Sequence, residues 1–580
     1  MHVAEVVTHD VPSTDAGDAR RRRIGRGEEF LLVAGVWLLG QLVFFREQWT
    51  SGFDRIMGDP GAARFIIYVN ENWYQSLLGH AAWRTPAFYF PIQHTLGLSD
   101  TLLLWQVVYT PARALGADPF LAYQLVLVAS SALGFATFYL LVRTLWHPPI
   151  ALRLLGAAVF TFSNALYVNA NHPQLFGVLL VPSVCLLGVA AWRAAQRGDP
   201  RGALWGAAFG ALGVLVAYST YYVGFFVGLA AVIAAILAVL VAPRATLASC
   251  GTALRRGWLV LLGVALGAVL PAILFAVTYL PALHAAGGYK LQSAYFFRAS
   301  LPDLVNVGVG NLLWGSTLVH GVVHGTAALS ERDYAPTPIL LVLSLLAAVL
   351  ASIREHRDAA PPGGRRYSSA VLASTGLLLA LAPMAIGSTF LWRAVYWIPG
   401  ASGIRAVDRI TVVASGLLVL ALVDAGARLA PWLRAAVPRP ALVAGVCALA
   451  ALLCLEQVNV TNSSQMSRRA QVALLAAPPA PPNACRSFFV ETATASAAHP
   501  ARVQTTAMLL SARYAIPTLN GTSGSFPRGW HLFFPVSGRG YLRHVAHWID
   551  VRHITGTVCA LDLDARTWSV FSPSRVRATR

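Results

Sequence analysis

Side chains that could take part in acid–base chemistry are concentrated in one segment, residues 58–100, although only 12% of the chain is charged. Five of its side chains are candidates for a site: Asp59, Arg64, Glu71, His94 and Asp100. A carboxylate can act as a general base that removes a proton from an attacking hydroxyl group. Asp59 is the candidate for this role, although an aspartate before Pro60-Gly61 is also an ordinary turn residue. The other four are candidate substrate-binding residues, and His94 could equally be an exposed loop histidine.

A second charged group precedes a long apolar segment and consists of Arg405, Asp408 and Arg409. Arginine presents planar, bidentate donors that match phosphate oxygens, and such donors stabilise the charge that grows on a phosphate leaving group. These residues therefore predict a clamp for the phosphate of a substrate, with Asp408 orienting an arginine. The alternative interpretation is a pair of interfacial arginines that extend toward lipid headgroups.

The elements that would position these residues are membrane-spanning helices. The chain has 580 residues, of which 56% are hydrophobic, and its mean hydropathy is +0.58. The apolar residues form long blocks, which indicates a polytopic α-helical membrane protein with about eleven spans of about 20 residues. Residues 102–115 are apolar but short, so we expect an interfacial or re-entrant helix there. The spans are expected at residues 30–45, 120–142, 150–168, 175–192, 203–218, 221–241, 258–280, 338–353, 370–390, 410–429 and 441–455.

The placement of arginines predicts the orientation of the spans. Residues 1–27 are expected to be a disordered cytoplasmic tail, because their arginines and the arginine-rich connections between later spans fall on one side. The transmembrane domain, residues 28–457, then presents outer loops 47–119 and 281–337, and residues 458–580 form an extracytoplasmic domain. The amino terminus is thus expected inside and the carboxyl terminus outside. The same placement accounts for the net charge of +19 without a nucleic-acid partner.

The carboxyl-terminal region changes character after the prolines at 478–482, which suggest a stiff linker. Short apolar stretches and turns follow, and they predict a small mixed α/β domain. Cys485 and Cys559 are the two cysteines of this region, and we expect them to pair because the outer compartment permits disulfides. Two unpaired thiols are the alternative. No cysteine spacing typical of a metal site is present, so no cofactor is expected and a divalent metal is not indicated.

Three motifs carry a resemblance to a known superfamily. The first contains Gly58-Asp59-Pro60-Gly61, Phe88-Tyr89-Phe90-Pro91 and Leu96-Gly97-Leu98-Ser99-Asp100; the second is Gly403-Ile404-Arg405-Ala406-Val407-Asp408-Arg409; the third is Pro517-Thr518-Leu519-Asn520-Gly521-Thr522-Ser523-Gly524 with Pro527 and Trp530. With an amino-terminal span, a large first outer loop and an outer domain, the chain resembles bacterial members of the GT-C superfamily of integral-membrane glycosyltransferases. The likeness covers most of the chain and implies a location in the bacterial inner (cytoplasmic) membrane.

The resemblance implies an inverting glycosyltransferase with Asp59 as its catalytic base. The sugar would come from a polyprenyl-phosphate donor and pass to an envelope or lipid-linked glycan acceptor on the outer face, with membrane lipids around the protein. Asn520 would lie in a sugar-binding loop, although its run of small polar residues is also typical of a tight turn. Many relatives have a second carboxylate soon after the first, whereas this chain has Ala62 and Ala63.

Two other functions are open at this point. A transporter or flippase of lipid-linked glycans would place ionisable groups within its spans, whereas these spans are nearly free of charge. A catalytically inactive, glycan-binding membrane scaffold would explain the absence of a second carboxylate near Asp59.

Overall fold

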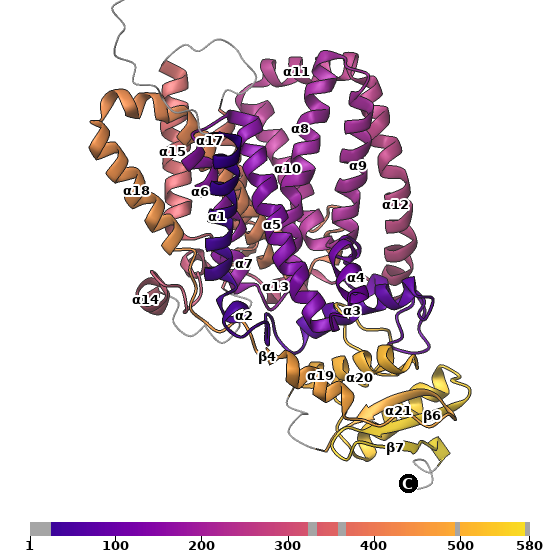
Figure 1. Ribbon diagram of the computed structural model, residues 1–580. Helices are drawn as coiled ribbons and strands as arrows, with labels where there is room; N and C mark the ends of the chain where they lie inside the picture. The colour runs from indigo at the N-terminus through magenta and orange to yellow at the C-terminus, as the bar shows by residue number, and fades with distance from the viewer. Residues whose placement is uncertain (1–24, 323–332, 358–366, 494–498, 575–580) are drawn as a thin grey trace, which may run out of the picture.

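The computed structural model describes residues 25–322, 333–357, 367–493 and 499–574, so the tail expected at 1–27 lies almost wholly outside the described residues. Long helices form a bundle, and a smaller region that contains a β-sheet lies at one end of it (Figure 1). The chain thus has the expected architecture of a polytopic helical protein with a small carboxyl-terminal α/β region.

Nine described helical segments are long and apolar enough to cross a membrane. They are α1 (Arg26–Phe44), α5 (Pro119–Trp146), α6 with α7 (Ile150–Thr161 and Asn164–Val168), a 3₁₀ helix with α8 (Pro173–Leu180 and Val181–Arg197), α9 (Gly202–Ser219), α10 (Tyr221–Val241), α12 (Trp258–Ala286), α15 (Pro338–Arg357) and a 3₁₀ helix with α17 (Val407–Ile410 and Thr411–Ala436). Two shorter apolar helices occupy the remaining expected segments, namely α16 (Ser368–Leu381) and α18 (Arg439–Leu455).

One of the expected spans is shorter than predicted. Its apolar segment extends to Phe390, but α16 ends at Leu381, and a hairpin of β2 (Ala385–Ile386) and β3 (Thr389–Phe390) follows. Pro383 cannot continue the helical hydrogen-bond ladder, and Gly387 has a φ of 59°, which suits a two-residue turn. The hairpin leads into the segment that carries Arg405 and Arg409.

Ion pairs join the helix ends that lie away from the carboxyl-terminal region. Glu29 in α1 pairs with Arg143 at the end of α5 (2.9 Å) and with Arg153 in α6 (3.3 Å). Arg428 in α17 pairs with Asp424 (2.9 Å) and with Glu355 of α15. The amphipathic helix α11 (Pro243–Arg256), which connects α10 to α12, lies at this same end (Figure 1). The arginines expected to lie together on one side of the membrane are therefore at one end of the bundle.

The opposite end of the bundle carries the polar loops. The first loop contains α2 (Arg46–Thr50), β1 (Arg55–Ile56), α3 (Ala62–Leu77) and α4 (Gln106–Ala114), and the later loop contains α13 (Leu291–Phe296) and α14 (His320–Val322). The apolar segment 102–115 forms a short 3₁₀ turn followed by α4, and it is too short to be a candidate span. Both loops and the carboxyl-terminal region thus lie at the same end of the molecule (Figure 1).

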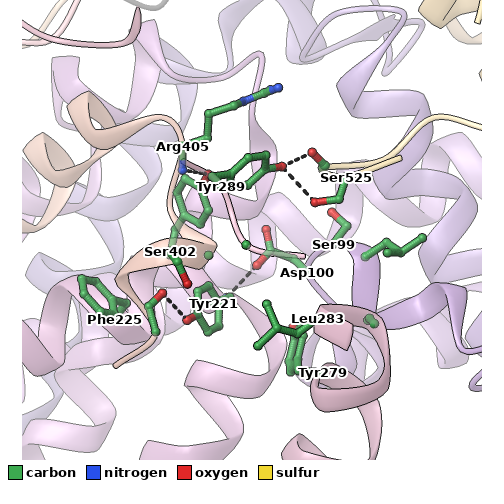
Figure 2. A pocket seen from close by; sticks show the side chains of 18 of the residues that line it. Ser99, Asp100, Tyr221, Phe225, Tyr279, Leu283, Tyr289, Ser402, Arg405 and Ser525 are labelled. Atoms are coloured by element: carbon green, nitrogen blue, oxygen red, sulfur yellow. Dashed lines mark hydrogen bonds between the residues drawn. The ribbon is translucent and has the colours of Figure 1, made fainter. Parts of the chain in front are cut away.

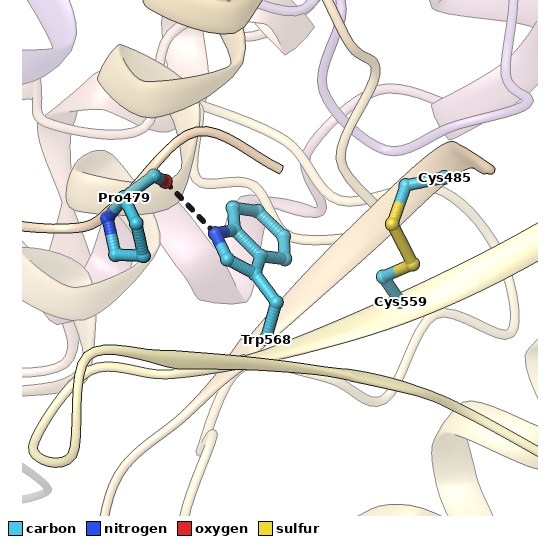
Figure 3. The surroundings of a disulfide bond; sticks show 4 residues. All are labelled: Pro479, Cys485, Cys559 and Trp568. Carbon is cyan, nitrogen blue, oxygen red and sulfur yellow. Dashed lines mark hydrogen bonds between the residues drawn. A yellow bond between two sulfur atoms is a disulfide. The ribbon is translucent and has the colours of Figure 1, made fainter. Parts of the chain in front are cut away.

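The carboxyl-terminal region is a three-stranded sheet with helices packed against it. Strand β5 (Cys485–Glu491) pairs in parallel with β6 (Thr557–Asp562), which pairs antiparallel with β7 (Thr567–Val570). The helices are α19 (Arg468–Ala476), α20 (Pro500–Tyr514) and α21 (Arg539–Val551). Cys485 and Cys559 form a disulfide between β5 and β6, with their Cα atoms 5.7 Å apart (Figure 3). Nearby, the Trp568 indole donates to the carbonyl of Pro479 (2.9 Å), which holds the proline-rich linker against β7.

Backbone pairing joins the first loop to the carboxyl-terminal region. Strand β1 pairs antiparallel with β4 (Met466–Ser467), and the amides of Tyr89 and Phe90 donate to the carbonyls of Asn520 and Thr518 (both 3.0 Å). The Trp548 indole of α21 donates to the Phe90 carbonyl (2.9 Å). The first and third sequence motifs therefore lie against each other, although more than four hundred residues separate them.

Candidate functional site

A cavity of about 560 Å³ lies where the bundle meets the carboxyl-terminal region (Figure 2). Several parts of the chain form its wall, among them the first loop at Ser99 and Asp100, the adjoining ends of α10 and α12, residues 399–409, and the third motif at Gly524 with the adjacent Ser525. All three motifs therefore contribute to a single space.

Among the described residues that line this cavity, Asp100 is the only one with a carboxylate. Its side chain is buried, and Oδ1 accepts a hydrogen bond from the Tyr221 amide at the start of α10 (2.6 Å). Burial raises the pKa of Asp100 to about 6, against the opposing effects of the Tyr221 amide and the nearby Arg409. The cavity thus contains an acidic group whose charge changes slightly below neutral pH.

Arg409 lies in the cavity wall and is largely buried. Its Nη2 atom is 2.9 Å from Nε2 of His172, and its guanidinium lies 5.6 Å from the centre of the Tyr222 ring. The 3₁₀ turn Val407–Ile410 places it directly before α17. A cation is therefore held in position at the base of a span, beside the Asp100 carboxylate whose pKa it influences.

Arg405 is half-buried, and its backbone amide donates to the Tyr222 hydroxyl (2.9 Å). Its guanidinium lies 5.6 Å from the centre of the Tyr289 ring and 5.2 Å from that of the Phe297 ring, an arrangement typical of cation–π contacts. Figure 2 shows Arg405 and Tyr289 in the cavity wall. Within the part of the chain that the structure describes, Arg405 forms no ion pair. Its fork of N–H groups can therefore donate hydrogen bonds to an anionic group of a ligand.

The remainder of the wall is mainly apolar and aromatic. Phe225 of α10 and Phe275, Tyr279 and Leu283 of α12 line the cavity. Leu283 is 45% exposed, and farther along α12 large apolar side chains such as Leu270 (75%) are exposed as well, as expected for a lipid-facing surface. An apolar surface thus runs from the cavity along the outside of the bundle.

Asp59, the expected base, is not among the residues that line the cavity. Its Oδ1 accepts hydrogen bonds from the amides of Gly61 and Ala62 (both 2.6 Å) at the start of α3, which is the geometry of a turn aspartate. The carboxylate is half-exposed, and Oδ2 accepts no hydrogen bond from the described residues. The side chain is therefore anchored through Oδ1.

Arg64 is fully buried in α3 and contacts the carboxyl-terminal region instead of the cavity. It donates to the Arg502 carbonyl (3.0 Å) and to Oγ1 of Thr506 (2.9 Å), both in α20. Burial, together with the neighbouring Arg502 charge, lowers the pKa of Arg64 to about 9. Arg64 thus fastens α20 to α3.

Glu71 is also buried and lies outside the cavity wall. Arg113 of α4 binds it through two hydrogen bonds (2.8 and 3.0 Å), and Tyr109 and Gln75 donate two more (2.8 Å each). Each carboxylate oxygen therefore already accepts two hydrogen bonds, and the group joins α3 to α4.

The other candidate residues have distinct surroundings. His94 has a φ of 60°, and its amide donates to Oγ1 of Thr85 (3.1 Å). Asp408 is buried. The Asn520 side chain accepts a hydrogen bond from the Val490 amide (2.8 Å) and donates one to the Tyr541 hydroxyl (3.2 Å). None of the three lines the cavity. Asp100, Arg405 and Arg409 are thus the candidate site residues that the fold brings together there.

Sequence reasoning missed several lining residues, notably Tyr222, Tyr289, Gln174 and Ser525. Tyr289 donates to the Gly524 carbonyl, and the Ser525 hydroxyl lies 3.1 Å from that of Tyr289, so the later loop and the third motif close the cavity together (Figure 2). The pair Tyr221-Tyr222 stands at the very start of an apolar segment, and this position was the sequence feature that could have indicated a lining residue. Within the described ranges, no group of three or more histidine, cysteine or acidic side chains could hold a metal ion.

No protein-family model matches the chain, and no curated protein matches it significantly. Among solved structures, it is similar to the oligosaccharyltransferase of Archaeoglobus fulgidus, with 12% identity and a TM-score of 0.45 over 91% of this chain and 67% of that one. It is also similar to the arabinofuranosyltransferase AftD from Mycobacteria, with 14% identity and a TM-score of 0.47 over 94% of this chain and 36% of that one. The chain therefore spans little more than a third of AftD. At such low identities and TM-scores, neither likeness by itself assigns an activity or a substrate to this chain.

Proposed function

We propose that this protein is an inverting membrane glycosyltransferase that transfers a sugar from a polyprenyl-phosphate donor to a glycan or lipid-linked acceptor on the outer face of the membrane. The observation that carries the proposal is the cavity itself. It combines two arginines, one buried carboxylate and an apolar wall that continues onto a lipid-facing helix.

The parts of such a donor suit different parts of the cavity. Arg405 and Arg409 would bind the phosphate and stabilise the charge that develops as it leaves. The prenyl chain would extend along the apolar side of α12, next to Leu283. The acceptor oxygen would attack the anomeric carbon while the bond to the phosphate oxygen breaks, and a carboxylate would take the acceptor's proton.

We propose Asp59 as that base, because its Oδ2 is available and its Oδ1 is fixed by two backbone amides. Asp100 is the competing carboxylate, because it lines the cavity. Its place beside Arg409 puts it on the phosphate side, where it would orient the arginine. For Arg64, Glu71, His94, Asp408 and Asn520 we propose a supporting role, in which they hold the loops and the carboxyl-terminal region around the cavity.

The location that we propose is the bacterial cytoplasmic membrane, with the amino terminus inside and the cavity outside. The arginines at the opposite end of the bundle support this orientation. Apart from the buried Asp424–Arg428 pair of α17, the described candidate spans are mainly apolar, which disfavours a transporter or flippase.

The test is sugar incorporation in membranes supplied with labelled polyprenyl-phosphate sugars. Asp59→Asn should abolish turnover while sparing donor binding, and Arg405→Ala should weaken donor use. Asp199→Asn is a matched control, because Asp199 also accepts a hydrogen bond from a nearby amide, that of Arg201 (3.0 Å), in a connection at the opposite end of the bundle. Full activity of Asp59→Asn with loss in Asp100→Asn would move the base to Asp100. No incorporation by the wild-type protein with any donor would favour the inactive scaffold.

A further inference from the structure

A second, smaller pocket lies between α3 and α20, where the first loop meets the carboxyl-terminal region, and we call it the α3–α20 pocket. Its volume is about 170 Å³, and it shares no described lining residue with the cavity. Tyr68, Asn72 and Ser511 are buried and form its inner part, whereas His80 and Ala82 are exposed and mark its mouth. Sites for drug-sized ligands measure about 300–1,000 Å³, so this pocket has room for a single ring and not for a chain.

The Asn72 side chain lines this pocket and has an amide nitrogen without a partner. The residue is 3% exposed, and its Nδ2 atom has no hydrogen-bond partner among the described residues. Asn70 shows the usual arrangement, because its Nδ2 donates to the Ile66 carbonyl (2.9 Å) and its Oδ1 accepts from Gln106 (2.7 Å). A buried donor without an acceptor costs stability. An oxygen atom of a ligand in the pocket would remove that cost.

Other polar groups of the pocket are held in place by their neighbours. Gln75 donates to Glu71 (2.8 Å), and its Oε1 lies 3.2 Å from Nδ1 of His80. The Thr85 hydroxyl accepts a hydrogen bond from the His94 amide (3.1 Å). Small apolar side chains complete the wall, among them Ala81, Ala87, Ala512 and Pro517. The pocket thus combines fixed polar groups with small apolar surfaces.

This lining selects against charged and against purely apolar ligands. Among the described residues that line the pocket, none is an aspartate, a glutamate, a lysine or an arginine, so an ionic ligand has no counter-charge apart from His80 at the mouth. An apolar ligand would leave the Asn72 amide unpaired. A pyranose ring suits both parts of the wall, since its hydroxyl groups donate and accept hydrogen bonds and its C–H faces are apolar.

We infer that the α3–α20 pocket is a subsite that binds one neutral sugar unit of the acceptor glycan, with Asn72 as a hydrogen-bond donor to a sugar oxygen. This inference rests on the proposed function for the source of the sugar. The first loop and the third motif build this pocket as they build the cavity, because Ala87 directly precedes the Phe88–Pro91 stretch and Pro517 begins the third motif. Helix α20 lies beyond the ends of the spans (Figure 1), where a glycan outside the membrane reaches it.

The test is saturation-transfer NMR on the full-length protein in nanodiscs of phosphatidylcholine. The probes are the methyl glycosides of glucose, galactose, mannose and N-acetylglucosamine, together with cyclohexylmethanol as an apolar ring and glucuronate as an anionic one. Asn72→Leu removes the amide at similar volume, and Ala82→Trp fills the mouth. Ala473→Trp in α19 is the matched control, because Ala473 is exposed and is not among the lining residues of either pocket.

At least one methyl glycoside should bind the wild-type protein, and neither cyclohexylmethanol nor glucuronate should displace it. Asn72→Leu should weaken this binding by about tenfold or more, because a sugar oxygen loses its donor. Ala82→Trp should abolish it, whereas Ala473→Trp and the cavity variant Arg405→Ala should retain it. Asn72→Leu should melt at the wild-type temperature or higher, while Asn70→Leu, which breaks two hydrogen bonds, should melt lower.

Several results would overturn the inference. If Ala82→Trp removes no methyl glycoside signal, the pocket holds solvent only. Displacement of the glycoside by cyclohexylmethanol or glucuronate would assign it another ligand class. Equal glycoside affinity in Asn72→Leu, or a melting temperature of that variant as low as that of Asn70→Leu, would make Asn72 a structural residue. Farnesyl phosphate, a donor mimic, should bind the wild type and Ala82→Trp equally, so a failure of the proposed donor site is seen separately from a failure of this subsite.

Discussion

Glu71→Ala should loosen the packing of α3 against α4 in the first loop. Glu71 binds the Arg113 guanidinium through two charged hydrogen bonds and receives a third from Tyr109. The side chains of Glu71 and Arg113 are only 7% and 19% exposed, so the alanine variant leaves a largely buried cation without its partner. Removal of one member of a buried ion pair costs about 3–5 kcal/mol.

Hydrogen–deuterium exchange of peptides from α3 and α4 measures this loss directly. Since about 1.4 kcal/mol corresponds to a tenfold change in an equilibrium constant, exchange through local opening should accelerate by about 10²- to 4 × 10³-fold. Peptides from α15, which lie far from the pair, serve as the internal control. The double variant Glu71→Leu with Arg113→Leu should recover most of the protection, because well-packed apolar side chains can replace a buried ion pair at little cost.

The opposite pattern would refute this reasoning. If Glu71→Ala leaves exchange in α4 unchanged but weakens binding of farnesyl phosphate, then Glu71 contacts substrate, and its four hydrogen bonds are not what holds α3 to α4.

Other predictions concern pH, the disulfide and the orientation. The raised pKa of Asp100 means that the folded protein binds more protons than the unfolded chain between the ordinary aspartate pKa of 3.8 and about 6, so stability should fall as pH rises through that window. Asp100→Asn should flatten this slope in thermal unfolding measured against pH, and an unchanged slope would contradict the assignment. Cys485→Ser should destabilise the carboxyl-terminal region by about 4 kcal/mol, since the bridge with Cys559 closes a loop with a separation of 74 residues. Equal urea midpoints for variant and wild type would argue against this. A periplasm-dependent reporter fused after Pro482 should be active, and activity of only a cytoplasmic reporter would reverse the proposed orientation.

The sequence predicted the spans well because a membrane-crossing helix is a local property, visible as about 20 successive apolar residues. The end of α16 was misplaced because apolarity continues past Pro383 into the hairpin, and hydropathy does not distinguish a span from a short apolar loop. Asp100, Arg405 and Arg409 were predicted as site residues because they are charged and lie next to apolar segments. A charged side chain there costs free energy unless it binds a ligand or another group.

Arg64 and Glu71 show what the sequence could not indicate. The partners of Arg64 are 438 and 442 residues away, and Arg113 is 42 residues from Glu71. No periodicity signals such contacts, so a buried structural charge and a ligand-binding charge look alike in the sequence. Tyr289 was missed for the same reason, because its place in the cavity depends on the later loop folding back onto the third motif.

The pairing of β1 with β4 also has a consequence for the synthesis of the protein. Asp54 accepts a hydrogen bond from the Arg469 amide, which is 415 residues later in the chain. At about 5–20 residues per second, a ribosome needs about 20–80 s to make that interval. During this time the first loop lacks these partners, and its polar backbone groups and apolar side chains are accessible to chaperones and proteases. The cavity is completed only when Ser525 emerges, so a chain interrupted before that residue would be inserted in the membrane yet lack one wall of its site.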